Sequence, residues 1–150
     1  MIEHVWSVVC SKAVIDRDTN NVSLQTVLEQ LKIKGEPKQE GLVPMKFDVM
    51  SLWSRSDDNK PCEGRFRLAY VSPSGKVLIN SEGEINLLNT ERFRSTVHSD
   101  GIPLGEGGRY KFKIEVQQEG EMEWSQVASI PLTVKFSPLE VKDEKDEKSE

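Results

Sequence analysis

The sequence predicts an all-β protein, an antiparallel two-sheet sandwich of the immunoglobulin-like kind with about seven to nine strands. Two observations predict this class. Short runs alternate apolar and polar residues with period two, as half-buried antiparallel strands do. Turn residues separate these runs at spacings of roughly 8 to 12 residues, and hardly any segment shows helical periodicity.

Length and composition are those of an ordinary globular domain. The 150 residues suffice for one domain with its own core, and 36% of them are hydrophobic while 30% are charged. Two cysteines are too few for a disulfide framework, and they lack the spacing of a metal or redox pair. We expect free thiols, with Cys10 buried and Cys62 in a polar loop, and we expect neither cofactor nor metal.

The N-terminal region contains one clear strand and one ambiguous segment. Residues 5–9 are apolar in both phases, which predicts a central strand, and residues 16–21 predict a turn with Asn20 or Asn21 at positive φ. Residues 22–33 fit a helix through Leu24, Val27, Leu28 and Leu31. They also fit a strand through Val22, Leu24, Thr26 and Leu28. We favour the strand, with a short helix as the alternative.

The middle of the chain predicts several strands. Residues 45–49 alternate and residues 50–52 continue in the other phase, which indicates a bulge or a strand covered on both faces. Phe66, Leu68 and Tyr70 alternate with Arg65 and Arg67, and this strand ends at the turn Pro73-Ser74-Gly75. Further strands are marked by residues 77–79, by Ile85 with Leu87, and by Phe93 with Val97.

The alternation is most regular in two late segments. Residues 109–116 alternate charged side chains with Tyr110, Phe112, Ile114 and Val116. Residues 130–136 repeat the pattern, although Pro131 indicates an edge or the start of a strand. A hairpin through residues 119–121 joins the two segments. The entry Gly108-Arg109-Tyr110 resembles the tyrosine corner of immunoglobulin-like domains.

The periodic pattern divides the chain into two parts. Residues 1–137 are predicted to form the β-sandwich domain. Residues 138–150 are predicted to be a charged, disordered tail, because residues 142–148 contain no apolar side chain that could anchor them.

Charge and hydropathy exclude some classes of partner. A net charge of −5 argues against a protein that binds nucleic acid through general phosphate neutralisation. The first residues have no basic segment and no long apolar segment of a signal peptide, and no apolar run approaches membrane-spanning length. We therefore expect a cytoplasmic protein without a membrane partner.

Three sequence strings resemble a known family. Residues 10–24 read Cys-Ser-Lys-Ala-Val-Ile-Asp-Arg-Asp-Thr-Asn-Asn-Val-Ser-Leu, and residues 71–77 and 108–112 contain a Pro-Ser-Gly turn and a Gly-Arg-Tyr strand. This order of turns and strands resembles a family of small bacterial β-sandwich proteins of unknown function. The resemblance implies a β-sandwich and supplies no catalytic residue. The chain departs from the family pattern in lacking an acidic residue before Pro73.

Signals for catalysis are weak. Residues 16–20 place oxygen ligands at alternate positions as in a calcium loop, but Asn21 and Val27 occupy the glycine and closing glutamate positions. No nucleophile elbow accompanies His4 or His98, which we expect at the surface. The glycine-rich residues 105–108 lead into a strand, where a phosphate-binding loop needs a helix. We therefore do not expect an enzyme.

The candidate binding residues are cations on three predicted strands and the exposed tryptophans. The cations fall on the outward phase and would make one basic face if the strands were neighbours: Arg65, Arg67, Arg92, Arg94, Arg109, Lys111 and Lys113. Solvated strand faces are the alternative. Among Trp6, Trp53 and Trp124, we expect Trp124 to be partly exposed.

These observations favour a noncatalytic protein-interaction or structural module. The alternative is a small-ligand binder for an anion or a sugar that uses the basic face or an exposed tryptophan. The expected partner is a protein. Formation of a homo-oligomer is left open.

Overall fold

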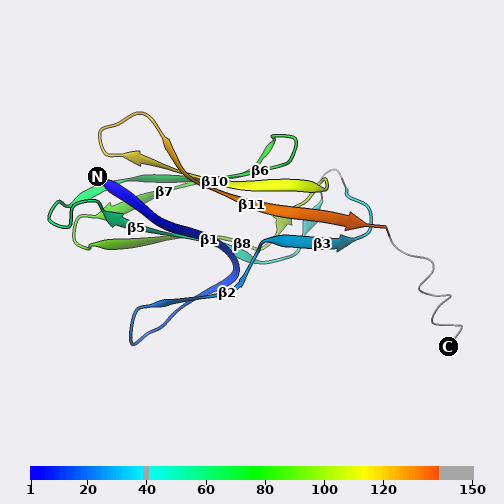
Figure 1. Cartoon of the computed structure of the whole chain (residues 1–150), viewed down its shortest axis with the longest axis horizontal. Helices are drawn as coiled ribbons and strands as arrows, with labels where there is room; N and C mark the ends of the chain where they lie inside the picture. Colours follow the sequence, from blue (N-terminus) through cyan, green and yellow to red (C-terminus); the bar gives the residue numbers. More distant parts are fainter. Residues whose placement is uncertain (39–40, 139–150) are drawn as a thin grey trace, which may run out of the picture.

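The computed structural model describes residues 1–38 and 41–138, and their strands form two packed sheets (Figure 1). The four-stranded sheet has the order β2-β1-β5-β8, with bounds Val22–Val27, Ile2–Ile15, Phe47–Arg55 and Arg92–Ser99. The five-stranded sheet has the order β3-β11-β10-β6-β7, with bounds Gln30–Lys34, Ser125–Ser137, Gly108–Gln118, Cys62–Val71 and Val77–Leu87. A small third sheet pairs β4 (Leu42–Val43) with β9 (Ile102–Pro103).

The all-β sandwich predicted from the sequence is confirmed. Alternation along β10 buries Tyr110, Phe112, Ile114 and Val116 between the sheets, as expected. On β6 the same alternation buries Phe66, Leu68 and Tyr70. Inward residues of β5 close the core from the other sheet: Phe47, Val49 and Trp53. Of the predicted tail, residues 139–150 lie outside the described residues.

The ambiguous segment at residues 22–33 forms strands, and there are two of them. β2 belongs to the four-stranded sheet and β3 to the five-stranded sheet. The chain crosses between them at Thr26, whose φ of 51° interrupts the extended backbone, and at Leu28, which is buried and donates its N–H to Val9 O. The strand interpretation is therefore confirmed, with a break that periodicity did not predict.

Three local predictions need correction. Residues 77–79 and Ile85 with Leu87 belong to one long strand, β7, because the chain continues pairing with β6 from Val71 to Cys62. Cys62 is the first residue of β6 and packs against the core instead of lying in a polar loop. The five-stranded sheet is mixed, since β3 pairs with β11 in parallel.

Pro131 sits where β11 has one open edge. Its partner on β10 is Lys111, while pairing with β3 begins only at Thr133. A missing N–H is tolerated there because no second ladder needs it. The edge predicted at Pro131 is therefore present, although Thr133 and Val134, which follow it in β11, are paired with strands on both sides.

The second half of β1 leaves the sandwich and makes a third layer (Figure 1). β1 pairs with β5 from Ile2 to Cys10 and with β2 from Cys10 to Ile15, so its partner changes at Cys10. We call residues 10–27 the hairpin arm. The turn of the arm has Asn20 at a φ of 58°, as predicted. Its tip reaches β8, because the Arg94 guanidinium donates to the backbone O and the side-chain Oδ1 of Asn20.

Candidate functional site

The predicted basic residues lie on two different sheets. Arg65 and Arg67 on β6 are next to β10, which carries Arg109, Lys111 and Lys113. Arg92 and Arg94 lie on β8 of the four-stranded sheet. The seven residues therefore do not form one face. The chain changes sheets between β7 and β8, and alternation along a strand cannot reveal such a change.

Arg65 and Arg67 are compensated by acids on neighbouring strands. Arg67 makes a bidentate ion pair with Glu115, with nitrogen–oxygen distances of 3.1 and 3.0 Å, and these bonds raise the pKa of its guanidinium. The guanidinium also lies 4.4 Å from the centroid of the Trp124 ring. Arg65 lies 3.4 Å from Glu82. Both arginines are therefore already paired with carboxylates of this protein.

The rest of that face carries a row of cations, which we call the basic strip. Its members come from β3, β10 and β11 and point outward: Lys32, Lys34, Arg109, Lys111, Lys113 and Lys135. Lys135 is opposite Lys32 in the parallel pair of β11 and β3, and Arg109 is opposite Thr133 on β11. None of the six makes an ion pair with any residue in the ranges 1–38 and 41–138.

Three of the six residues of the basic strip were not predicted from the sequence: Lys32, Lys34 and Lys135. Lys32 and Lys34 alternate with the inward Leu31 and Ile33, so an outward lysine phase is visible in the sequence. The pairing of β3 with β11 was not visible, because it joins segments from opposite ends of the domain. Only that pairing brings Lys32 beside Lys135.

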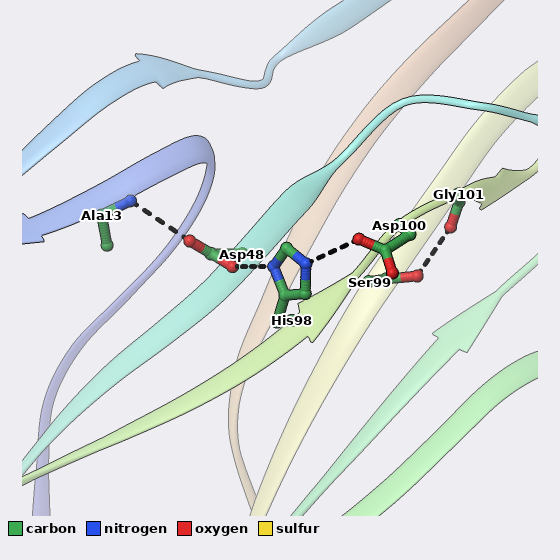
Figure 2. Close-up of polar contacts among 6 residues, drawn as sticks. All are labelled: Ala13, Asp48, His98, Ser99, Asp100 and Gly101. Carbon is green, nitrogen blue, oxygen red and sulfur yellow. Dashed lines mark hydrogen bonds and ion pairs between the residues drawn. The ribbon is translucent and has the colours of Figure 1, made fainter.

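His98 is held between two carboxylates on the outer face of the four-stranded sheet (Figure 2). Its Nδ1 lies 2.7 Å from Asp48 Oδ1 and its Nε2 lies 2.9 Å from Asp100 Oδ1. Asp48 Oδ2 also accepts the N–H of Ala13 at 3.2 Å, which ties the base of the hairpin arm to β5. The hydrogen bonds that the imidazole donates to Asp48 and, second, to Asp100 raise the pKa of His98. The imidazole of His98 is at the surface, as predicted, with its side chain 54% exposed. The same prediction is wrong for His4, which is half-buried with its ring 5.2 Å from that of the buried Trp53.

A cleft of about 610 Å³ lies between the tip of the hairpin arm and the outer face of β5 and β8. Trp6 and Leu52 form its apolar part, and Arg92 and Arg94 enter it from β8. The remaining wall comes from the turn of the arm, the start of β2, the loop before β8 and β8 itself: Asn20, Asn21, Val22, Thr90, Glu91 and Phe93. The cleft thus unites two predicted cations with one predicted tryptophan.

The three tryptophans occupy different environments. Trp53 is buried in the core and donates from Nε1 to Ser95 Oγ. Trp6 and Trp124 are half-buried on the outer faces of opposite sheets. The expected partial exposure of Trp124 is confirmed, although Arg67 covers one face of its ring.

A second hollow, about 520 Å³, lies at one end of the sandwich beside Tyr110. Its polar groups bond to one another: Glu106 Oε1 accepts from Ser74 N at 3.0 Å and from Ser74 Oγ at 2.8 Å, and these bonds lower the pKa of Glu106. The Tyr110 hydroxyl donates to Glu106 O at 2.7 Å, which confirms the predicted tyrosine corner. These contacts fix loops and leave few groups for a ligand.

The oxygen-rich turn at residues 16–20 uses its carboxylate internally. Asp16 Oδ1 accepts the backbone N–H of Asp18 at 2.8 Å and of Thr19 at 3.3 Å. This is the bonding of an Asx turn. It explains the presence of the Asp16 carboxylate in the turn without a bound cation. The residues that the structure describes contain no group of three or more His, Cys, Asp and Glu side chains arranged to hold a metal.

Comparisons with known proteins assign this chain to no family. No protein-family model and no curated protein matches the chain. The C-terminal domain of Wzt superposes with a TM-score of 0.48 at 11% identity, over 91% of this chain and 74% of that one. A family 123 glycoside hydrolase from Clostridium perfringens gives a TM-score of 0.44 at 7% identity, over 93% of this chain and 28% of that one.

An immunoglobulin-like protein from Pseudomonas aeruginosa gives a TM-score of 0.36 at 12% identity, over 90% of this chain and 97% of that one. The two sheets of this chain support the family resemblance inferred from the sequence only as a β-sandwich fold. Within the described ranges, no helix has the length and apolar character needed to cross a membrane.

Proposed function

We propose that this protein is a noncatalytic interaction module whose basic strip docks an acidic segment of a protein partner. The observation that carries the proposal is the set of six outward cations without an ion-pair partner among residues 1–38 and 41–138. On a protein with a net charge of −5, such a local excess attracts carboxylates.

The geometry of the strip fits an extended acidic segment. Alternate residues along a strand are about 6.8 Å apart, and neighbouring strands are about 4.8 Å apart. Arg109, Lys111 and Lys113 therefore form a row that matches alternate side chains of an extended chain. Neutral residues of β11, Ser129, Pro131 and Thr133, flank this row and leave it accessible.

Single-stranded nucleic acid is a poorer match. Proteins that bind it combine cations with exposed aromatic platforms for the bases. Across the strip, the outward side chains of β3, β10 and β11 are polar, charged or proline, and Trp124 stacks on Arg67 outside the strip. The acidic character of the whole chain also opposes a phosphate backbone.

The proposed setting is the cytoplasm. Cys10 and Cys62 are both free, as expected in a compartment where thiols stay reduced.

The test measures binding of fluorescently labelled poly-L-glutamate to the full-length protein by anisotropy, at low and at high sodium chloride. We expect binding at low salt that weakens as salt rises, because exposed charges are screened. The double variant Lys111→Gln/Lys135→Gln should weaken binding about three- to tenfold, since each exposed pair contributes about 0.2–1 kcal/mol. The matched control Lys60→Gln/Arg65→Gln removes two cations that already have acidic partners.

The control should change binding less than the strip variant does. Equal losses in both variants would show a general charge effect and overturn the proposal, as would no binding at low salt. Preferential binding of heparin over poly-L-glutamate would assign the strip to a non-protein polyanion instead. A full-length variant with every acidic residue of 139–150 changed to its amide tests the chain's own C-terminal segment. Tighter poly-L-glutamate binding by that variant identifies the segment as a competitor for the same strip.

A further inference from the structure

We propose that the cleft under the hairpin arm is a binding site for a small anionic ligand that carries a ring, such as a sugar acid, a sugar phosphate or a nucleotide. This site is independent of the proposed function, because it lies on the four-stranded sheet while the basic strip lies on the five-stranded sheet.

Its size and lining fit a small polar ligand. A volume of about 610 Å³ falls within the range of roughly 300–1,000 Å³ that is usual for small-molecule sites. Most of the wall consists of amide, hydroxyl and charged side chains, which apolar ligands would leave unsatisfied. The cleft therefore selects for a ligand that can make several hydrogen bonds.

Two arginines provide the anion recognition. Arg92 and Arg94 project from the same face of β8, about 6.8 Å apart along the strand. Neither forms an ion pair with a residue in the described ranges. Arg94 is oriented by its bonds to Asn20, whereas the Arg92 guanidinium has no hydrogen-bond partner among the described residues. A carboxylate or phosphate between them would accept bidentate bonds and relieve their mutual repulsion.

Trp6 provides the surface for a ring. It is half-buried on the outer face, lines the cleft and lies beside Leu52, its register partner on β5. An indole in this position can stack against the flat face of a sugar or a base. The arginines and the stacking surface lie in one cleft, so the ligand must carry both an anionic group and a ring.

The hairpin arm holds these groups in place. Asp48 fixes its base through the Ala13 N–H, and Arg94 fixes its tip through Asn20. The turn itself is closed by the bonds Asp16 N to Asn21 O and Asn20 N to Asp16 O, both 2.8 Å. A wall supported at both ends presents the amides of Asn20 and Asn21 to the cleft without a large ordering cost on binding.

The test follows the indole N–H signals of the full-length protein by two-dimensional NMR while probes are added. The anionic ring probes are glucuronate, glucose 6-phosphate and AMP. The partial probes are glucose, adenosine and inorganic phosphate. We expect at least one anionic ring probe to shift the Trp6 signal, assigned with Trp6→Phe, while the buried Trp53 signal and the Trp124 signal on the opposite sheet stay in place. The corresponding partial probes should bind at least tenfold more weakly.

Variants then test the assigned residues. Arg92→Gln should weaken the affinity for the best probe about 10- to 100-fold, as expected for the loss of a charged hydrogen-bond partner. Arg92 is exposed, so this change should leave the fold intact. The matched control Arg65→Gln removes an exposed arginine from the other sheet and should leave the affinity unchanged.

Several outcomes would overturn the proposal. One is no shift of the Trp6 signal with any anionic ring probe at millimolar concentration. Others are equal binding of charged and neutral probes, or unchanged affinity in Arg92→Gln. Binding of the sugar probes without AMP would identify a sugar as the ring, and the reverse would identify a base. Either result supports the site.

Discussion

Trp53 and Ser95 lie on adjacent strands of the four-stranded sheet, and the Trp53 Nε1–H donates a 2.9 Å hydrogen bond to Ser95 Oγ inside the core. Ser51 is opposite Ser95 and bonds in turn to Ser7 Oγ at 2.6 Å. His4 Nε2 completes the row at 2.7 Å from Ser7 Oγ. Polar side chains from three strands thus lie on the buried side of the sheet, and Ser95 among them satisfies the indole of Trp53, the largest side chain of the core.

Ser95→Ala should destabilise the protein because it leaves the buried indole N–H without an acceptor. The expected loss is about 1–3 kcal/mol in the free energy of unfolding. Urea unfolding followed by circular dichroism measures it. The control Ser129→Ala changes an exposed serine on β11 and should stay within about 0.5 kcal/mol of the parent. Equal stabilities of the two variants would contradict the role of Ser95.

The two histidines should titrate on opposite sides of the ordinary value. Burial lowers the pKa of His4, whereas hydrogen bonds donated to Asp48 and Asp100 raise the pKa of His98. NMR titration of the two imidazole signals measures both values. Asp48→Asn should bring the pKa of His98 down toward its usual range while leaving that of His4 unchanged. A His98 pKa below that of His4 would refute the assignment.

The raised pKa of His98 predicts that the stability of the protein depends on pH. The folded-state pKa of His98 lies above its unfolded value of about 6.5, so its stabilising contribution is complete below about pH 6.5. This contribution is lost as the pH rises through the raised folded-state pKa. Replacing His98 by Gln should remove that dependence, and unfolding midpoints of parent and variant should then converge at high pH.

Gly64 has no room for a side chain. A Cβ there would lie 2.4 Å from the backbone oxygen of Gln117 on β10 and 2.7 Å from Ile2 Cδ1. Gly64→Ala should therefore cost about 1–3 kcal/mol or more through overpacking where β1, β6 and β10 meet. Gly107→Ala is the matched control, since its nearest contacts would be ordinary ones at 3.5 and 3.7 Å. Thermal unfolding of the two variants should separate them clearly.

The two thiols should differ in reactivity. Cys10 is buried, and desolvation followed by the charge of Asp48 raises its pKa, so little reactive thiolate is present. Cys62 is only partly buried at the start of β6. Ellman's reagent should react with one thiol in the native protein and with the second only after unfolding. Cys62→Ser should abolish the native reaction, and a fast reaction in that variant would contradict the burial of Cys10.

Sequence patterns predicted which face of each strand is buried better than they predicted which strands lie next to each other. Alternation along β10 and β6 placed Tyr110 and Phe66 inward because a strand's side-chain period depends only on local geometry. Which strands are adjacent depends on long-range contacts, so Arg92 was grouped with cations of the other sheet. The hairpin-arm cleft was invisible for the same reason. Trp6 and Arg92 share one face because β1, β5 and β8 are neighbours in the four-stranded sheet, and the hairpin arm after Cys10 adds the opposite wall of the cleft.

The parallel pairing of β3 with β11 affects how this protein folds during its synthesis on the ribosome. β3 emerges early, but the strand that it pairs with in the described residues is β11, so Leu31 and Ile33 stay unpaired until residues 133–137 have been made. Contacts so distant in sequence form slowly, and an unpaired strand is open to wrong partners meanwhile. Lys32 and Lys34, which alternate with those apolar residues, give the nascent strand charges that oppose aggregation until β11 arrives.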